Sequence, residues 1–256
     1  MKRNIKSWAE SFVSAAVLGT FLLIIISVTT SGGTKKPAPS PPGSIGWWRA
    51  EGSARDSAGR HHGKLLNGAS FARGKVGRAF SFNGTTQCVE IAYSPSLVPS
   101  NYTIAAWVKP LAQVSDSISQ DVIFGQSYGY CQLLARTGDT GVRVAFAFGI
   151  SHYTFFEATG TGEIPIGKFS HLVGTWDGTT LRLYINGVLN AETTPGESPV
   201  DSGCPFFIGG FYSPEEKDCN YVGQFFHGLI DEVSYFNRAL SEAEVESLYS
   251  PGIKGK

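Results

Sequence analysis

The feature that most constrains this chain is residues 171–194, which read HLVGTWDGTTLRLYINGVLNAETT. Two turn signals, Asp177-Gly178 and Asn186-Gly187, separate three short runs rich in Val, Leu, Tyr, Ile and Thr. Asp-Gly and Asn-Gly supply the positive φ angles of tight hairpin turns, and the flanking residue types favour strands. The segment therefore predicts an antiparallel meander.

The middle run of this segment alternates with a period of two. Leu181, Leu183 and Ile185 fall on one face, and Arg182, Tyr184 and Asn186 on the other. Such alternation is typical of a strand with one buried face.

The rest of the chain from Ile45 onward also favours short strands over helices. The predicted strands cover residues 79–82, 88–92, 102–108, 121–125, 131–135, 143–149, 154–158, 171–176, 181–185, 206–209 and 228–236. Gly and Pro turn signals separate them. Many short strands with such turns predict an all-β sandwich or barrel.

One short helix is expected close to the C-terminus. Ser241 and Glu244 have the spacing of a capping box, in which each side chain bonds the other residue's backbone N–H. Val245 and Leu248 would then face the core, and Pro251 would end the helix.

Seven blocks of sequence resemble, in the right order, the laminin G-like, concanavalin A-like jelly-roll domains. The blocks are residues 47–52 (WWRAEG), 56–63 (DSAGRHHG), 74–84 (GKVGRAFSFNG), 89–95 (VEIAYSP), 103–110 (TIAAWVKP), 171–188 and 228–249 (GLIDEVSYFNRALSEAEVESLY). The resemblance covers about residues 45–249. It implies two curved antiparallel sheets packed face to face, with inward side chains such as Phe80, Phe82, Trp107, Trp176 and Val233.

The first 31 residues are predicted to stand apart from this fold. Positive residues precede an apolar run at residues 12–28, whose length lies between that of a secretory signal and that of a spanning helix. We expect residues 1–31 to be either an uncleaved membrane anchor or a removed signal peptide. Both alternatives place the domain outside the cytoplasm, membrane-anchored or secreted.

The remaining boundaries follow from composition. Residues 32–44 are rich in Pro, Gly and Ser and are expected to form a spacer. The jelly roll is assigned to residues 45–250, with a tail at 251–256. Lys plus Arg equals Asp plus Glu at 21 each, so the charge does not favour a nucleic-acid partner.

The four cysteines are an even number in a chain that we expect to be exported, which favours two disulfides. Of the three possible pairings we expect Cys204–Cys219, which closes a short loop, and by elimination Cys88–Cys131. A zinc site is the alternative, but no pair has Cys-x-x-Cys spacing.

No pattern predicts catalysis. A retaining glycosidase needs two carboxylates close together, but Glu90 is followed at alternate positions by Ala92 and Ser94. Asp231 and Glu232 are adjacent and should point to opposite faces of a strand. A Gly-x-Ser-x-Gly match occurs at residues 125–129 (GQSYG), but it lies between two predicted strands and lacks the following helix that a nucleophile elbow requires. We therefore expect no enzyme activity.

The resemblance implies a possible structural calcium ion. Related domains often join the loop that contains Asp56 to the strand that contains Asp231 through calcium, and both positions are filled here. Carboxylate and carbonyl oxygens suit this ion. In the alternative, Asp56 forms an Asx turn and Asp231 hydrogen-bonds a loop.

A ligand site is expected in residues 211–226, FYSPEEKDCNYVGQFF. Tyr212 and Tyr221 could stack on sugar faces while Asn220 binds hydroxyls, and Cys219 would tether the loop. In the alternative these aromatic side chains are core residues.

Taken together, these features predict an exported, membrane-anchored, non-catalytic module that binds a glycan or a cell-surface or extracellular protein. The alternatives are a structural or adhesive envelope protein without a discrete ligand site, or a divergent glycoside hydrolase or lyase.

Overall fold

The computed structural model describes residues 40–114, 120–126, 129–151, 154–213, 219 and 221–253. The predicted anchor or signal at residues 12–28 lies outside them. Within the described part of the chain, no helix is long and apolar enough to cross a membrane.

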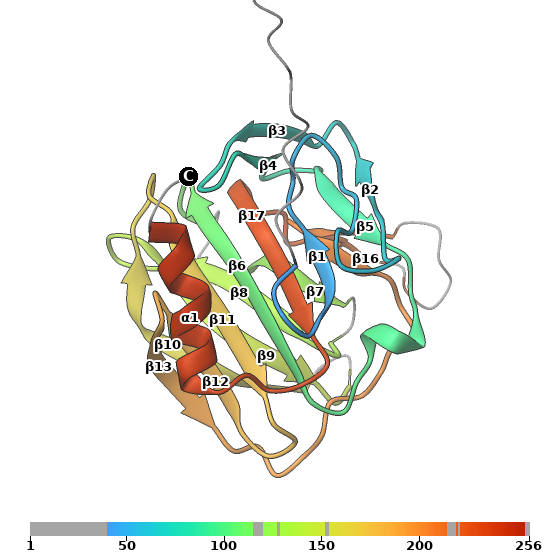
Figure 1. The fold of residues 1–256 in the computed structure, drawn as a ribbon, viewed down its shortest axis with the longest axis vertical. Helices are drawn as coiled ribbons and strands as arrows, with labels where there is room; N and C mark the ends of the chain where they lie inside the picture. The colour runs from blue at the N-terminus through green and yellow to red at the C-terminus, as the bar shows by residue number, and fades with distance from the viewer. Residues whose placement is uncertain are drawn as a thin grey trace, which may run out of the picture. The chain divides into compact units, whose positions relative to one another are not determined.

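The described strands form two antiparallel sheets and a small ribbon (Figure 1). In spatial order the first sheet contains β13 (Val188–Thr193), β12 (Leu181–Ile185), β11 (Ser170–Trp176), β6 (Tyr102–Pro110), β17 (His227–Phe236), β4 (Arg78–Asn83) and β3 (Ser70–Arg73), and β1 (Ser44–Trp48) pairs with the second half of β17. The second sheet contains β10 (Phe155–Ile164), β9 (Val142–Gly149), β8 (Gln132–Thr137), β7 (Gln120–Gln126), β14 (Phe206–Ile208), β5 (Cys88–Ile91) and β2 (Gly63–Leu66). The ribbon pairs β15 (Phe211–Ser213) with β16 (Tyr221–Gly223). A 3₁₀ turn, η1 (Pro95–Leu97), and a helix, α1 (Glu242–Ile253), complete the list.

The predicted meander is confirmed as β11, β12 and β13, which pair in order. Its turns use the backbone conformations that the sequence required: φ is 92° at Gly178, 53° at Asn186 and 84° at Gly187. All eleven predicted strands are present, and the two-sheet sandwich is confirmed.

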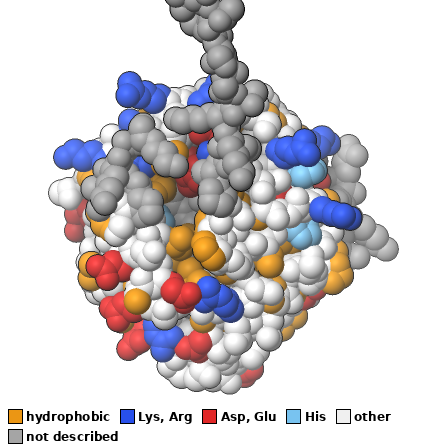
Figure 2. All heavy atoms as spheres, in the orientation of Figure 1, with side chains coloured by type: hydrophobic (Ala, Val, Ile, Leu, Met, Phe, Trp, Pro, Cys, Tyr) orange, Lys and Arg blue, Asp and Glu red, His pale blue; other side chains and the backbone are white. Residues whose placement is uncertain are grey.

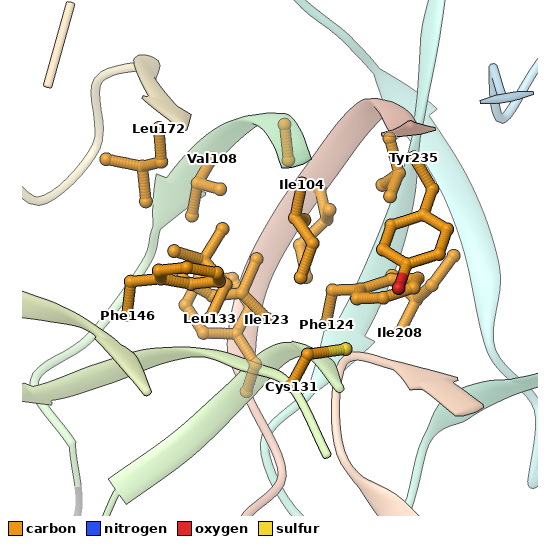
Figure 3. Close-up of a cluster of buried hydrophobic side chains, with 14 of the residues drawn as sticks. Ile104, Val108, Ile123, Phe124, Cys131, Leu133, Phe146, Leu172, Ile208 and Tyr235 are labelled. Atoms are coloured by element: carbon orange, nitrogen blue, oxygen red, sulfur yellow. The ribbon is translucent and has the colours of Figure 1, made fainter. Parts of the chain in front are cut away.

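The main core lies between the two sheets. Along β6 the alternate residues Tyr102, Ile104, Ala106 and Val108 point into it. Figure 3 shows Ile104 and Val108 facing side chains of the second sheet. Of the predicted core residues, Phe80, Phe82, Trp176 and Val233 belong to this cluster, as predicted.

The prediction for Trp107 is wrong in direction. Its parity in β6 is opposite to that of Ile104, so it lies on the outer face of the first sheet, where it is 5% exposed. The ring stacks on Tyr249 of α1, with centroids 5.7 Å apart. Burial under a helix explains why a large aromatic residue occupies an outward position.

The helix α1 covers this outer face (Figure 1). The predicted capping box is present: the N–H of Ser241 donates to Glu244 over 2.9 Å, and the N–H of Glu244 donates to the Ser241 hydroxyl over 3.4 Å. Val245 is buried and Leu248 packs beside it. The helix extends to Ile253 and so continues through Pro251, contrary to prediction.

One of the two predicted disulfides is confirmed. Cys204 and Cys219 are bonded, with Cα atoms 5.6 Å apart. Cys88 and Cys131 are free and buried, so that pairing was wrong. Cys131 points into the main core (Figure 3), whereas Cys88 belongs to the cluster on the opposite, outer face of the second sheet. A sheet between the two sulfur atoms prevents their bonding.

Candidate binding site on the outer face of the second sheet

The outer face of the second sheet brings together polar side chains that the sequence did not single out. Strand pairing places one residue from each of six strands in a row across it: Glu90, Phe207, Gly125, Gln132, Ala147 and Glu157. Directly paired residues share a face of the sheet. Gln132 is therefore flanked by Gly125 and Ala147, the two smallest members of the row.

Gln132 is the central feature of this face. The side chain is only 3% exposed. Its Nε2 lies 3.5 Å from the carbonyl oxygen of Gln126, but its buried Oε1 has no hydrogen-bond partner among the described residues. An unsatisfied buried acceptor costs about 1–3 kcal/mol. A ligand hydroxyl could donate the missing hydrogen bond once neighbouring side chains move aside to expose this oxygen.

A paired Arg and Glu lie on the same face, with Arg136 four residues from Gln132 along β8 and Glu157 two strands away. Nη1 and Nη2 of Arg136 donate to the two carboxylate oxygens of Glu157 over 3.0 and 2.6 Å. Nη2 also bonds Gln120, and Thr159 donates to Glu157. This bidentate pair reaches from β8 to β10 across β9, and about a third of each side chain is exposed. It fixes hydrogen-bonding groups in a charge-neutral arrangement.

The ribbon β15–β16 borders this face. Phe211 packs edge to face on Phe207, with ring centroids 5.7 Å apart. Both rings belong to a cluster that includes Leu134, Ala145 and Ala147 of the sheet, against which Tyr212 and Phe225 also pack. The ribbon is held by the Cys204–Cys219 disulfide and by the N–H of Val122, which donates to the carbonyl of Gln224 over 2.8 Å.

The predicted ligand residues are only partly accounted for. Tyr212 is half-buried against the apolar cluster, which agrees in part with the alternative interpretation of a core residue. Asn220 and the side chain of Tyr221 lie outside the described residues. Their roles stay predictions. Gln132, Arg136 and Glu157 were missed, although Gln132 and Glu157 lie within the predicted strands 131–135 and 154–158 and Arg136 directly follows the first of these.

The acidic residues that the structure describes on this face are far apart. Glu90 and Glu157 are separated by five strand intervals, about 24 Å at about 4.8 Å each. Glu157 pairs with Ala147 of β9, and Glu163 pairs with Arg143 of the same strand. Ala147 and Arg143 are four residues apart, which places Glu157 and Glu163 about 14 Å from each other. Both separations exceed the roughly 5–9.5 Å of glycosidase carboxylate pairs.

Asp56, one of the two predicted calcium ligands, already has several partners. Its Oδ1 accepts hydrogen bonds from the N–H groups of Trp47, Ala58 and Gly59, and its Oδ2 accepts one from His61, all within 2.9–3.0 Å. This arrangement fits the alternative interpretation of Asp56 as the centre of a turn. It leaves little capacity for a cation.

Asp231, the other predicted ligand, has a different environment. It is fully buried; Oδ2 accepts a hydrogen bond from the N–H of Val76 over 2.9 Å, and Oδ1 has no partner among the described residues. Burial raises the pKa of this carboxyl to about 8. Trp47 lies between the two aspartates: its backbone N–H donates to Asp56, and its indole N–H donates to Glu232, the neighbour of Asp231.

Asp231 therefore fits a cation ligand better than Asp56 does. Within the described ranges, no group of three or more His, Cys, Asp and Glu side chains is placed to hold a metal ion. Any calcium ion would depend on Asp231 together with backbone carbonyl oxygens, which calcium accepts.

The sandwich and its helix define the chain as a jelly-roll domain of the concanavalin A-like kind. The chain belongs to a laminin G family, Laminin_G_3, described as the concanavalin A-like lectin/glucanases superfamily, which matches residues 83–246. The resemblance seen in the sequence blocks is thereby confirmed. No curated protein matches the chain.

Solved structures with the same fold include several binding domains. Domain 4 of AbnA, an extracellular GH43 arabinanase from Geobacillus stearothermophilus in complex with arabinotriose, has a TM-score of 0.64 and 20% identity, covering 80% of this chain and 98% of that one. The binding domain of Paraclostridial Mosquitocidal Protein 1 has a TM-score of 0.61 and 17% identity, covering 80% and 52%. The receptor binding domain of a botulinum neurotoxin C/D mosaic has a TM-score of 0.61 and 14% identity, covering 82% and 51%.

This chain thus spans about half the length of those two toxin domains. At these identities the likeness concerns the fold alone.

Proposed function

We propose that this protein is an exported, membrane-anchored, non-catalytic module that binds a glycan on the outer face of its second sheet. The observation that carries the proposal is the buried Oε1 of Gln132, which lies between Gly125 and Ala147 and has no hydrogen-bond partner in the described part of the chain. Sugars combine hydroxyl donors with apolar CH faces. A sugar hydroxyl would bind Gln132, and the CH face of the sugar would lie on aromatic side chains of the bordering ribbon.

The arrangement of acids supports binding rather than hydrolysis. The register places Glu157 about 14 Å or more from the other acidic residues described on this face, Glu90 and Glu163. Arg136 also holds both carboxylate oxygens of Glu157. A carboxylate fixed in this way is suited to orienting a ligand.

Two further observations support the wider proposal. The arabinanase domain of the same fold was solved with arabinotriose, which makes a neutral oligosaccharide a reasonable first probe. The Cys204–Cys219 disulfide suits an oxidising, extracytoplasmic compartment. The proposed anchor, residues 12–28, depends on the sequence pattern alone.

A polysaccharide screen with two readouts tests the proposal. The full chain is incubated with arabinotriose, arabinan and a panel of neutral polysaccharides, and both binding and released reducing sugar are measured. Binding without release is the expected result. Neither binding nor release would favour a structural or adhesive envelope role, and release would favour a divergent hydrolase or lyase.

Substitution of Gln132 by Met tests the site itself. Gln132→Met removes the unpartnered carbonyl oxygen while keeping the length of the side chain, so it should weaken glycan binding by about 5- to 150-fold, the equivalent of about 1–3 kcal/mol. The free energy of unfolding should fall by no more than about 1 kcal/mol, because Oε1 has no partner among the described residues and Nε2 makes only the long 3.5 Å contact with Gln126.

Gln87→Met is the matched control, since the side chain of Gln87 donates from Nε2 to the carbonyl of Gly68 and lies outside the row that contains Gln132. Equal loss of binding in both variants would contradict the site. Tyr212→Ala and Tyr221→Ala test the ribbon, and unchanged binding in both would exclude it.

We also propose a structural calcium ion at Asp231. The support is its buried Oδ1 without a described partner, in a loop junction that includes Val76. A cation there would keep the carboxylate ionised and link β17 to the segment before β4. A chelator should then lower the midpoint of thermal unfolding in the wild type but not in Asp231→Asn. An unchanged wild-type midpoint would contradict the proposal.

A further inference from the structure

A second surface, distant from Gln132, has a different chemistry. Residues 54–64, here called the basic loop, read ARDSAGRHHGK. The loop closes on itself, because the N–H of Gly63 donates to the carbonyl of Ala54 over 2.8 Å. It is also fixed to β1: the N–H of Ser57 donates to the Trp47 carbonyl over 2.7 Å, and the Trp48 indole donates to the His61 carbonyl over 2.7 Å.

The only acidic residue of the basic loop is turned inward. Asp56 is 3% exposed, and its carboxylate accepts four backbone hydrogen bonds, three of them from the loop itself. The negative charge therefore organises the loop from within and does not lie on its surface. The exposed charged side chains of the loop are Arg55, Arg60 and Lys64.

These three cations differ from most arginines of the domain. Arg49, Arg136, Arg143, Arg182 and Arg238 each form an ion pair with an acidic side chain. Arg55, Arg60 and Lys64 form none with any residue in the described ranges. The chain as a whole has a formal net charge of zero, but within this loop Arg55 and Arg60 concentrate positive charge without an ion pair, whereas Lys64 lies opposite Glu90.

The surroundings of the basic loop add hydrogen-bonding groups. His62 is exposed, and Nε2 of His61 lies 3.1 Å from the hydroxyl of Ser96, which is 2.8 Å from that of Ser94. Figure 2 shows His side chains beside those of Lys and Arg in the region where Figure 1 places β2. The acidic neighbour is Glu90, the cross-strand partner of Lys64.

We propose that the basic loop binds an anionic polysaccharide through its sulfate or carboxylate groups. Arg guanidinium groups bind such planar or tetrahedral anions through paired hydrogen bonds, and a loop held in one conformation loses little entropy on binding. This surface is separate from the proposed neutral-glycan site. Lys64 lies in the same cross-strand row as Gln132, four strand intervals or about 19 Å away.

The side chains of the loop favour a polysaccharide over other polyanions. Insertion into a lipid surface is normally aided by large apolar side chains, but residues 54–63 contain none larger than Ala. Single-stranded nucleic acid is normally held by stacking on Phe, Tyr or Trp, and the loop has none of these.

Binding measurements on the full chain test the proposal. The probes are dextran sulfate, polygalacturonate, uncharged dextran of matched length and phosphatidylglycerol vesicles. We expect binding to dextran sulfate, polygalacturonate or both, with the two probes distinguishing sulfate from carboxylate recognition, and none to dextran. Affinity should fall as salt rises, because bound cations release counterions from a polyanion.

Two charge-matched variants decide whether the basic loop is responsible. Arg55→Gln/Arg60→Gln should weaken binding of the polyanion at least tenfold and make it less dependent on salt. Lys109→Gln/Lys168→Gln removes the same charge elsewhere, from residues without an ion pair in the described chain, and should change binding less than twofold. All four cations can be replaced without emptying the core, and thermal unfolding checks that the variants fold.

Three results would overturn the proposal. The first is absence of binding to both anionic polysaccharides, and the second is equal weakening in the two double variants. The third is tighter binding to the vesicles than to either polysaccharide, lost in Arg55→Gln/Arg60→Gln, which would assign the loop to lipid headgroups. Binding of the neutral glycan at Gln132 should be unchanged in these variants, so failure of one proposal is distinguishable from failure of the other.

Discussion

His171 should make the stability of this domain dependent on pH. The side chain is 3% exposed under α1, with its ring centroid 4.9 Å from that of Trp107 and 6.1 Å from that of Tyr249. Its Nδ1 has no hydrogen-bond partner among the described residues. Burial lowers the pKa of His171 from 6.5 to about 3.

The direction and size of the effect follow from proton linkage. Between pH 6.5 and about pH 3 the unfolded chain binds a proton at His171 that the folded chain does not, so stability is full above pH 6.5 and is lost as the pH falls. pH 5.0 lies 1.5 units below the pKa of 6.5 that His171 has in the unfolded chain. At about 1.4 kcal/mol per unit, the folded state should lose about 2 kcal/mol of stability at that pH.

The assay is urea unfolding of the wild type and His171→Phe at pH 7.5 and pH 5.0. Phe keeps a ring against Trp107 and Tyr249 but does not titrate. We expect the wild type to lose about 2 kcal/mol more than the variant over this interval. His227→Phe, at an exposed position, is the control and should behave as the wild type. If the wild type and His171→Phe lose the same stability, the reasoning is refuted.

Three other changes test the packing, the disulfide and the helix cap. Gly174→Ala should lower the free energy of unfolding by about 1–3 kcal/mol, because the new Cβ would overlap the Phe146 ring. Gly162→Ala is the control: its Cβ would be 3.8 Å from Asn190, so it should have little effect in the same urea titration. Cys204→Ser/Cys219→Ser should lower the free energy of unfolding by about 3 kcal/mol, because it removes the disulfide. In the wild type, the thiols of Cys88 and Cys131 should react only after denaturation, and reactive thiols in the native state would contradict their burial. Ser241→Ala should cost about 1 kcal/mol by removing the cap of α1, and an unchanged urea midpoint would show that the cap does not contribute.

The strands were predictable because their patterns are local. Leu181 and Leu183 alternate with polar residues between two Gly turns, and the structure buries both, as expected. β2 and β3 were missed, since GKLL and SFAR carry no clear alternation, and their strand conformation depends on pairing with β5 and β4. Such edge strands are specified by tertiary contacts.

The errors at Trp107 and at Cys88–Cys131 have a common cause. In each case residue type indicated burial but not the layer in which the side chain is buried. This sandwich has an apolar layer between its sheets, another under α1 and a third beneath the β15–β16 ribbon. Trp107 and Cys88 belong to the outer layers, which the sequence pattern of a single strand does not reveal.

The candidate site was hidden for a related reason. Gln132, Arg136 and Glu157 lie on two strands with a third between them, and their relation depends on register across β8, β9 and β10. The small residues Gly125 and Ala147 on either side of Gln132 become meaningful only once that register is known.

The position of β1 determines how the domain would respond to mechanical force. This strand is the first of the described fold, and within the described sheets it pairs only with β17, in the middle of the first sheet. Any tension transmitted through the preceding segment would load the hydrogen bonds between Ser44 and Phe236 first and those of Trp48 and Val233 last. These bonds would open one after another until the pull reaches Trp47 and Trp48, whose buried rings and hydrogen bonds to residues 56–61 would resist further detachment, while β17 stays held by β4 and β6.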